Sequence, residues 1–290
     1  MKNSSKAESK RYAERFRAKP GHRVRLKDID PDFTGKGEDK KSAERTIEKL
    51  EKRMEDLQSQ LYAEGKRSLL ICLQALDAGG KDGVVRHVLG TMNAQSCRVV
   101  SFKQPSSEEL AHDFLWRIEA QTPRRGEVRV FNRSHYEDVL IVRVHDLVPK
   151  QIWSRRYEQI NDFERRLSAN NTRIIKFFLH ISKDEQLERF RQRLYDPAKN
   201  WKISESDYSE RQYWDQYQTA YEDAINKCTT DEAPWYVIPA NHKWFRNLVI
   251  SQIIVETLEG MDIQRPEPMV NIEEIRKKYH EALAQNQKRK

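Results

Sequence analysis

Short apolar runs that alternate with helical segments constrain the fold of this chain most strongly. The run SLLICLQAL is continuous in apolar residues, as expected of a strand buried on both faces of a parallel sheet. It and four similar runs lie at residues 68–76, 98–103, 128–132, 172–181 and 235–239. Segments of helical periodicity surround them, at residues 42–64, 107–120, 136–146, 150–168, 183–194, 210–226 and 244–258. This alternation predicts an α/β fold of three layers, with a mostly parallel five-stranded sheet between helices.

Shifts in composition divide the chain into three predicted parts. Residues 1–41 are rich in charge and hold two prolines and three glycines, which predicts an extended basic arm with little core of its own that could still pack on the domain. Residues 42–265 contain every predicted strand and form the expected catalytic domain. Residues 266–290 are predicted to form an exposed helical tail, rich in Lys and Arg.

The balance of charge favours a polyanionic partner. The chain carries 53 Lys+Arg against 45 Asp+Glu, a formal net charge of +8, which suits nucleic acid, phosphorylated metabolites or polyphosphate alike. Residues 1–16 are basic and polar, and no apolar run approaches the length of a membrane span. Cys72, Cys97 and Cys228 show neither CxxC nor metal-ligand spacing, so we expect reduced thiols and a cytoplasmic protein.

A glycine-rich segment, DAGGKDG, follows the first predicted strand directly. Ligands of parallel sheets bind at the carboxyl ends of the strands, where the N–H groups around Gly79, Gly80 and Gly83 could close on a phosphate. Lys81 adds a full positive charge beside them. The segment departs from the Walker A pattern GxxxxGK[ST], because Ala75 replaces the first glycine and Asp82 the Ser or Thr. The alternative is a plain strand-to-helix turn with a solvated lysine.

Asp77 is the unexpected member of this loop. A carboxylate inside an anion-binding loop costs electrostatic free energy unless a metal ion or a proton-bearing acceptor compensates it. We therefore predict that Asp77 binds a metal ion or orients the acceptor. The alternative is an aspartate that caps the following helix.

The third apolar run ends in the polar sequence FNRSHYE, at the position of a Walker B element. Asn132 and Arg133 are therefore predicted to face the reaction centre, with Arg133 holding phosphate through paired hydrogen bonds. Alternatively, Arg133 starts a helix and pairs with Glu137. We expect His135 to be structural, because phosphoryl transfer depends on positioning and charge neutralisation more than on proton removal.

A second cation-rich segment, ERFRQRLYDPAKNWK, follows the fourth predicted strand. Arg189 and Arg193 are four residues apart on one helical face, and Lys199 and Lys202 lie beyond a proline. We predict a mobile lid at about residues 189–210 that closes on a polyphosphate. The alternative is an ordinary solvated charge run. Trp201 is either the apolar anchor of the lid or part of the core.

Together, DAGGKDG, FNRSHYEDVLIVRVH and RLYDPAKNWKIS resemble the polyphosphate kinase 2 family in order and spacing, over residues 69–258. The resemblance implies a P-loop kinase-like fold with a helical lid. It implies Mg²⁺-dependent, reversible transfer of phosphoryl groups from inorganic polyphosphate to AMP and ADP, giving ATP, with guanine nucleotides as further candidates. It also implies a homo-oligomer, and we expect neither a nucleic-acid nor a membrane partner.

The resemblance assigns roles to residues of this chain. Asp77, Lys81 and Arg133 match the catalytic residues, and Asp77 also the metal ligand; Asn132 and Glu137 border the nucleotide. The phosphate-binding positions are Gly79, Gly80, Asp82, Gly83, Arg189, Arg193, Lys199 and Lys202. Many members carry Asp at the position of Asn132, and the Asn form resembles the subgroup called class III, which accepts both AMP and ADP.

Two other readings stay open at the level of the sequence. An ATP-dependent small-molecule kinase would share the sheet, the loop and the lid. A non-enzymatic polyanion-binding protein would explain the net charge, but it would not require Asp77 within an anion-binding loop.

Overall fold

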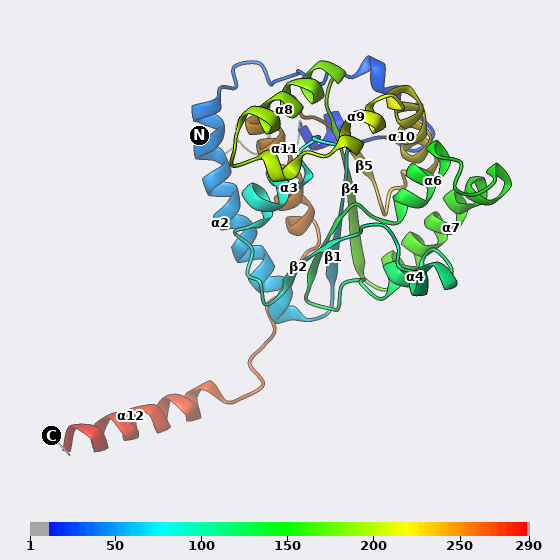
Figure 1. Cartoon of the computed structure of the whole chain (residues 1–290). Helices are drawn as coiled ribbons and strands as arrows, with labels where there is room; N and C mark the ends of the chain where they lie inside the picture. Colours follow the sequence, from blue (N-terminus) through cyan, green and yellow to red (C-terminus); the bar gives the residue numbers. More distant parts are fainter. Residues whose placement is uncertain (1–11, 289–290) are drawn as a thin grey trace.

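Five parallel strands form the central sheet of the computed structural model, which describes residues 12–288 (Figure 1). The strands are β1 (Ser68–Gln74), β2 (Cys97–Ser101), β3 (Val128–Asn132), β4 (Thr172–His180) and β5 (Trp235–Pro239). They lie in the order β2-β3-β1-β4-β5. All five predicted strands are present, and the predicted α/β class is confirmed.

The central position of β1 explains its unbroken apolar sequence. All seven of its residues are buried, because β3 and β4 flank it and helices cover both faces. Its register with β3 places Leu73 opposite Asn132, and the Arg133 N–H donates to the Leu73 carbonyl at 3.1 Å. The segments that follow β1 and β3 therefore begin side by side at the same edge of the sheet.

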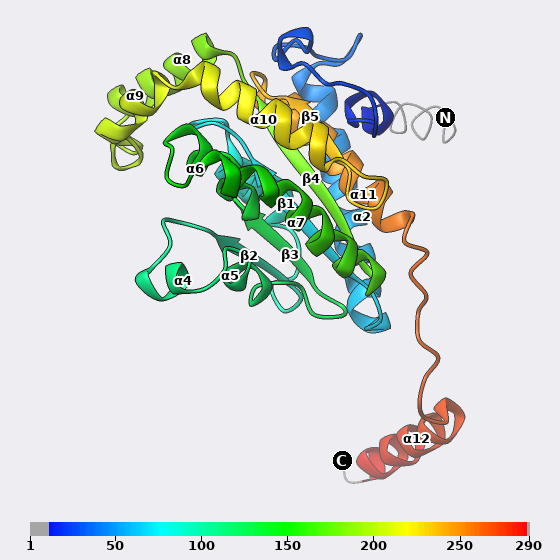
Figure 2. The same ribbon diagram turned by 90° about the vertical axis from the view of Figure 1, so that its right-hand side faces the viewer.

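Two pairs of helices cover the sheet. On one face α2 (Lys40–Glu64) packs on α11 (Lys243–Glu259), and on the other α7 (Lys150–Ala169) packs on α10 (Trp214–Cys228) (Figure 2). The apolar stripe of α2 enters the largest buried cluster through Met54, Leu57 and Leu61. A capping box between Asp39 and Ser42 begins this helix, and Gly65, in the left-handed conformation, ends it.

Three predicted helices are each interrupted in the structure. Residues 107–120 form α4 (Ser107–Ala111) and α5 (Trp116–Glu119), because His112 is extended and the Asp113 carboxylate accepts from the Leu115 N–H. Residues 136–146 form a 3₁₀ turn, η3 (His135–Val139), and α6 (Ile141–Val144). Residues 210–226 belong to α9 (Glu205–Arg211) and α10. The remaining helical segments near the site are α3 (Lys81–Val84), η2 (Val85–Leu89), α8 (Lys183–Tyr195) and η4 (Asn200–Lys202).

The described part of the N-terminal arm, which includes the short η1 (Leu26–Asp28), packs on the domain and contributes to its core. Tyr12 and Phe16 are buried against Phe245 of α11, with edge-to-face ring contacts. The Ala18 N–H donates to the Trp235 carbonyl at 2.9 Å, so the arm runs along the β5 edge of the sheet. Residues 1–11 of the predicted arm lie outside the described residues.

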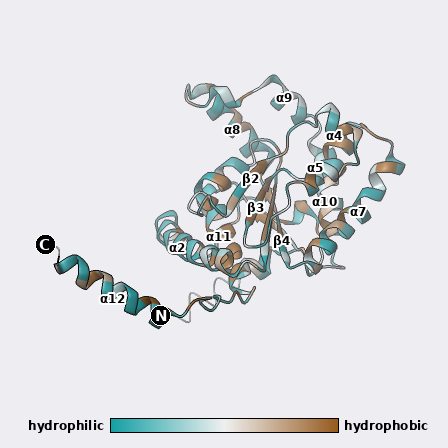
Figure 3. Ribbon diagram, turned by 90° about the horizontal axis from the view of Figure 1, so that it is seen from below, coloured by the Kyte–Doolittle hydropathy of each residue, from teal (hydrophilic) through white to brown (hydrophobic). Residues whose placement is uncertain are grey.

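The C-terminal helix α12 (Ile272–Lys288) extends away from the domain (Figures 1 and 3). It carries an exposed apolar stripe made of Ile272, Ile275, Tyr279 and Leu283. Among the described residues, no helix combines the length and the apolar character that crossing a bilayer requires.

Candidate active site

The loop that joins β1 to α3 has the tight backbone of a phosphate-binding loop. Ala78 and Gly80 have positive φ angles of 57° and 102°, and a Cβ on Gly79 would lie 2.4 Å from the Ala75 Cβ. Gly80 is the N-cap of α3 and makes no side-chain cap. Asp77 lies three residues before this cap, so it does not cap the helix as the alternative prediction had it.

Lys81 is positioned inside this loop. Its Nζ donates to the Ala75 carbonyl at 2.7 Å, which folds the side chain back over the loop. Burial, reinforced by the nearby Arg133 guanidinium, lowers the pKa of Lys81 to about 8. A phosphate bound beside Lys81 would favour the charged ammonium and raise this pKa again.

An ion pair joins the loop to the end of β3. Arg133 Nη2 donates to Asp77 Oδ1 at 3.1 Å, and both side chains are partly exposed. Arg133 has a φ of 62°, an uncommon conformation for a residue other than glycine and one found at functional sites. Arg133 thus pairs with Asp77, whereas the alternative prediction paired it with Glu137. Burial raises the pKa of the Glu137 carboxyl, while Arg133 and Lys81 partly oppose that rise.

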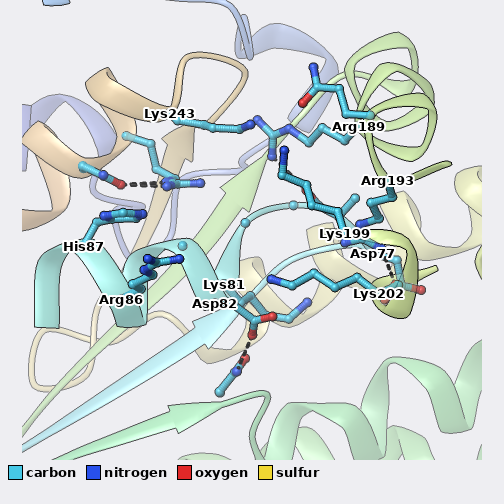
Figure 4. A pocket seen from close by; sticks show the side chains of 18 of the residues that line it. Asp77, Lys81, Asp82, Arg86, His87, Arg189, Arg193, Lys199, Lys202 and Lys243 are labelled. Atoms are coloured by element: carbon cyan, nitrogen blue, oxygen red, sulfur yellow. Dashed lines mark hydrogen bonds between the residues drawn. The ribbon is translucent and has the colours of Figure 1, made fainter. Parts of the chain in front are cut away.

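A large cavity of about 1230 Å³ opens above the loop (Figure 4). Eleven lysines and arginines and six carboxylates line it, so its walls carry an excess of positive charge. Of the residues predicted for the site, all but Glu137 line this cavity: Asp77, Gly79, Gly80, Lys81, Asp82, Gly83, Asn132, Arg133, Arg189, Arg193, Lys199 and Lys202. The structure therefore brings together residues up to 125 positions apart in the chain, from Asp77 to Lys202.

A smaller cavity of about 280 Å³ adjoins the first. Glu137 lines it, together with the rings of Trp214, Tyr217 and Tyr221. Asp77 and Arg133 line both cavities, so the two spaces meet at this ion pair. The larger space is suited to an extended anion and the smaller one to a planar group with polar substituents.

The predicted lid residues differ in their surroundings. Arg193 Nη1 donates to the Lys202 carbonyl at 3.1 Å and lies 3.4 Å from Asp207 Oδ2. Lys199 pairs with Asp196. Trp201 is 77 % exposed and lies beside the Lys202 ammonium, which excludes the prediction that it belongs to the core.

Arg189 lines the cavity, but protein groups already satisfy its guanidinium. It donates to the carbonyls of Ala78, Ala240 and Asn241 and to the Glu185 carboxylate. Only 5 % of Arg189 is exposed. Its geometry is that of a residue that braces the loop backbone, whereas the sequence predicted a lid cation open to phosphate.

His135 lies under the sheet edge and lines neither cavity. It is fully buried, with its Nε2 3.0 Å from Glu164 Oε1. Tyr136 and Lys176 bond to the same carboxylate. Desolvation lowers the pKa of His135, as expected of a neutral imidazole in a structural network.

Several cationic or titratable side chains of the larger cavity were absent from the sequence prediction, among them Arg86, His87, Lys243 and Arg246. Arg246 is 2 % exposed, and its Nη1 lies 2.1 Å from where a Cβ on Gly80 would be. A side chain at Gly80 would therefore have to displace the Arg246 guanidinium, in addition to the strain that the positive φ of Gly80 imposes. One signal was available in the sequence, since Arg246 sits on a buried face of the apolar helix WFRNLVISQIIV.

The carboxylates of the larger cavity fit a metal ion that arrives together with phosphates. The described residues hold no group of three or more His, Cys, Asp or Glu side chains that could enclose an ion. Asp77 and Asp82 both line the cavity, and Asn132 Nδ2 donates to Asp82 Oδ1 at 3.0 Å. Mg²⁺ is commonly held by one or two carboxylates plus substrate phosphates, so these residues suit it.

A strand, a glycine-rich loop and a helix next to a cation-lined cavity define a protein of the P-loop kinase type. The sequence model of the family "Polyphosphate kinase 2 (PPK2)" matches residues 37–266. The chain belongs to this family, as its three motifs predicted.

The chain is also similar to individual members. It is 52 % identical to an AMP/ADP-polyphosphate phosphotransferase of Meiothermus ruber, over 90 % of this chain and 98 % of that protein. It is 46 % identical to an ADP-polyphosphate phosphotransferase of Rhodopseudomonas palustris, over 87 % of this chain and 91 % of that one. The crystal structure of polyphosphate kinase 2 from Arthrobacter aurescens TC1 matches with a TM-score of 0.89 and 42 % identity, over 93 % of this chain and 96 % of that one.

Proposed function

We propose that this protein transfers phosphoryl groups from inorganic polyphosphate to AMP and ADP, which yields ADP and ATP. The observation that carries the proposal is the meeting of two unlike cavities at the Asp77–Arg133 ion pair. The names of the similar proteins from Meiothermus ruber and Rhodopseudomonas palustris support the same donor and acceptors.

The larger cavity is the proposed donor site. Its excess of cations suits a chain of phosphates, and Lys81 with the loop amides lies beside the point where both cavities meet. Lys199, Lys202 and Arg193 come from the lid and would close over the chain. Arg189 is proposed to brace the loop, for the reason given by its hydrogen bonds.

The smaller cavity is the proposed acceptor site. The rings of Trp214 and Tyr217 offer faces on which a nucleobase could stack, and Glu137 and Glu210 offer hydrogen-bond acceptors. Arg133 would hold the acceptor phosphate from its position between the cavities. Asn132 lines the larger cavity, where its Nδ2 donates to Asp82 Oδ1, and its predicted place beside the nucleotide stays a prediction.

The reaction breaks the terminal P–O–P bond of polyphosphate and forms a new P–O–P bond at a nucleotide phosphate oxygen. The protein contributes alignment and charge stabilisation, because this transfer needs little covalent help. Lys81 and the loop amides would stabilise the negative charge on the transferred group and on the shortened chain. Arg133, itself held by the Asp77 carboxylate, would hold the acceptor oxygen in line.

Phosphoryl transfer between polyphosphates generally needs a divalent metal, because four or more oxyanions must approach one another. We propose Mg²⁺, held by Asp77, and by Asp82 beside it, together with substrate phosphates. The ion would neutralise phosphate charge when bound. We also propose that the transfer is reversible, because the P–O–P bond that breaks and the P–O–P bond that forms are similar.

A cytoplasmic location and a homo-oligomer also belong to the proposal. Free thiols at Cys72, Cys97 and Cys228 suit a reducing compartment, and burial raises the pKa of all three. The exposed apolar stripe of α12 offers a surface that an assembly could cover. The division into an arm, a domain and a tail stays a prediction as well.

The proposal is tested with purified protein, Mg²⁺ and long-chain polyphosphate, with AMP or ADP as acceptor and the adenine nucleotides separated by chromatography. We expect ADP to appear before ATP when AMP is the acceptor. Omitting polyphosphate controls for exchange between two ADP molecules, and EDTA tests the metal. Formation of ATP from ADP that does not depend on polyphosphate would contradict the proposal, as would phosphorylation that requires ATP as donor.

A further inference from the structure

Arg246 is a buried cation without an acidic partner among the described residues. Its Nε and Nη2 both donate to Oδ1 of its own neighbour Asn247, at 3.0 and 2.7 Å, and its Nη1 points at Gly80 of the phosphate loop. Burial, followed by the repulsion from Arg189, lowers the pKa of the guanidinium. A buried charge that nothing neutralises is costly, so such a residue is expected to have an anionic ligand.

The surroundings of Arg246 add to the positive charge. Lys243 lies one turn earlier on α11, and burial together with the neighbouring Arg189 lowers its pKa. Glu185 opposes this shift, while Arg246 and Lys199 act on Lys243 in the same direction as Arg189. The first N–H groups of α11 receive no side-chain cap from His242, and the positive end of a helix attracts anions.

The opposite wall of this part of the cavity comes from the segment after the phosphate loop. There α3 widens into a single π-helical turn, η2, a feature frequent at functional sites. Arg86 and His87 of this turn are exposed, line the cavity, and form no ion pair with any described residue. Figure 4 shows both side chains on the side of the cavity away from Asp77.

These four residues lie away from the acceptor. The described residues that line the smaller cavity include Asp77 and Arg133. They do not include Arg86, His87, Lys243 or Arg246. A chain whose end is held at Asp77 and Arg133 would therefore have to cross the phosphate loop to reach them.

We propose that Arg246, Lys243, Arg86 and His87 form a distal subsite, which binds phosphates of the polyphosphate chain remote from the one transferred. The inference rests on the proposed function and deepens it. The chain runs from the ion pair across Gly80 to Arg246, and continues between α11 and η2. The subsite selects long polyphosphate chains over short ones, because a short chain held at the reaction centre leaves it empty.

The test compares kcat/KM for a polyphosphate of about 60 phosphates and for tripolyphosphate, with ADP as the fixed acceptor. Lys243→Gln and Arg246→Gln should each lower kcat/KM for the long chain by about tenfold, the effect of losing one charge-assisted hydrogen bond. The value for tripolyphosphate should change by less than about threefold, and the KM for ADP should stay that of the wild type. Lys243 is much more exposed than Arg246, so Lys243→Gln keeps the test valid if Arg246→Gln does not fold.

Lys150→Gln is the matched control, because Lys150 and Lys243 are each the first residue of a long helix and Lys150 lies outside both cavities. Equal losses for both chain lengths in Lys243→Gln would overturn the distal subsite and make the residue part of the reaction centre. A ratio of kcat/KM for the long chain to kcat/KM for tripolyphosphate that is the same in Lys243→Gln as in the wild type would also overturn it. Absence of polyphosphate-dependent ATP in the wild type would instead refute the proposed function, so the two failures are distinct.

Discussion

The lowered pKa of Lys81 makes polyphosphate binding dependent on pH in a defined direction. In the free protein this pKa is about 8, and a bound phosphate raises it, so binding takes up a proton above pH 8. Lys81 is about nine-tenths protonated at pH 7 and about one-tenth at pH 9. The affinity for polyphosphate is therefore highest below pH 8 and falls about tenfold between pH 7 and pH 9.

Isothermal titration calorimetry measures this effect without turnover, with polyphosphate added to the protein in the absence of nucleotide. Repeating the titration at pH 8 in buffers of different ionisation enthalpy reports the proton taken up. Lys81→Ala should bind more weakly and should lose the dependence on pH. Two results would refute the reasoning: an affinity that is the same at pH 7 and pH 9, or an affinity that falls with pH as steeply in Lys81→Ala as in the wild type.

The site and the residues that support it lead to four further predictions. Lys81→Ala should lower kcat by about 10² to 10³, as expected for the loss of one donor to the transition state, and steady-state ATP formation measures it. Trp214→Leu should raise the KM for ADP by about tenfold through lost stacking and leave the KM for polyphosphate unchanged; equal changes in both would contradict the assignment of the two cavities. Lys176→Met should lower the free energy of unfolding by about 3–5 kcal/mol in a urea titration, because it leaves the Glu164 carboxylate buried without its cation. His135→Ala should leave kcat within about threefold, and a loss as large as that of Lys81→Ala would give His135 a catalytic role.

The sequence was sufficient to predict the elements that depend on local pattern. The run of β1 and the glycines that follow it predicted a buried strand and a phosphate loop, because burial on both faces and tight backbone turns each select residue types directly. The ion pair between Asp77 and Arg133 was not predicted, although both residues were. It depends on the register of β1 with β3, which the local sequence does not encode.

Residues whose role depends on distant packing were missed or assigned differently. Arg246 lies 166 residues after Gly80 in the chain, and it reaches the phosphate loop only because α11 packs beside that loop. Arg189 appeared as a free cation beside Arg193, but the structure shows carbonyls of two other segments around its guanidinium. The predicted helix at residues 107–120 is interrupted for a local reason, since the Asp113 carboxylate accepts a hydrogen bond from the Leu115 N–H that competes with the helix.

The central claim is that polyphosphate is the phosphoryl donor, and luciferase detection of ATP tests it most directly. Purified protein is mixed with Mg²⁺ and ADP, with long-chain polyphosphate as the sole added donor, and Lys81→Ala is assayed alongside. We predict ATP in amounts that grow with added polyphosphate and fall by about 10² to 10³ in the variant. ATP formation that does not depend on polyphosphate would contradict the proposed donor. Equal ATP formation in Lys81→Ala would contradict the proposed site.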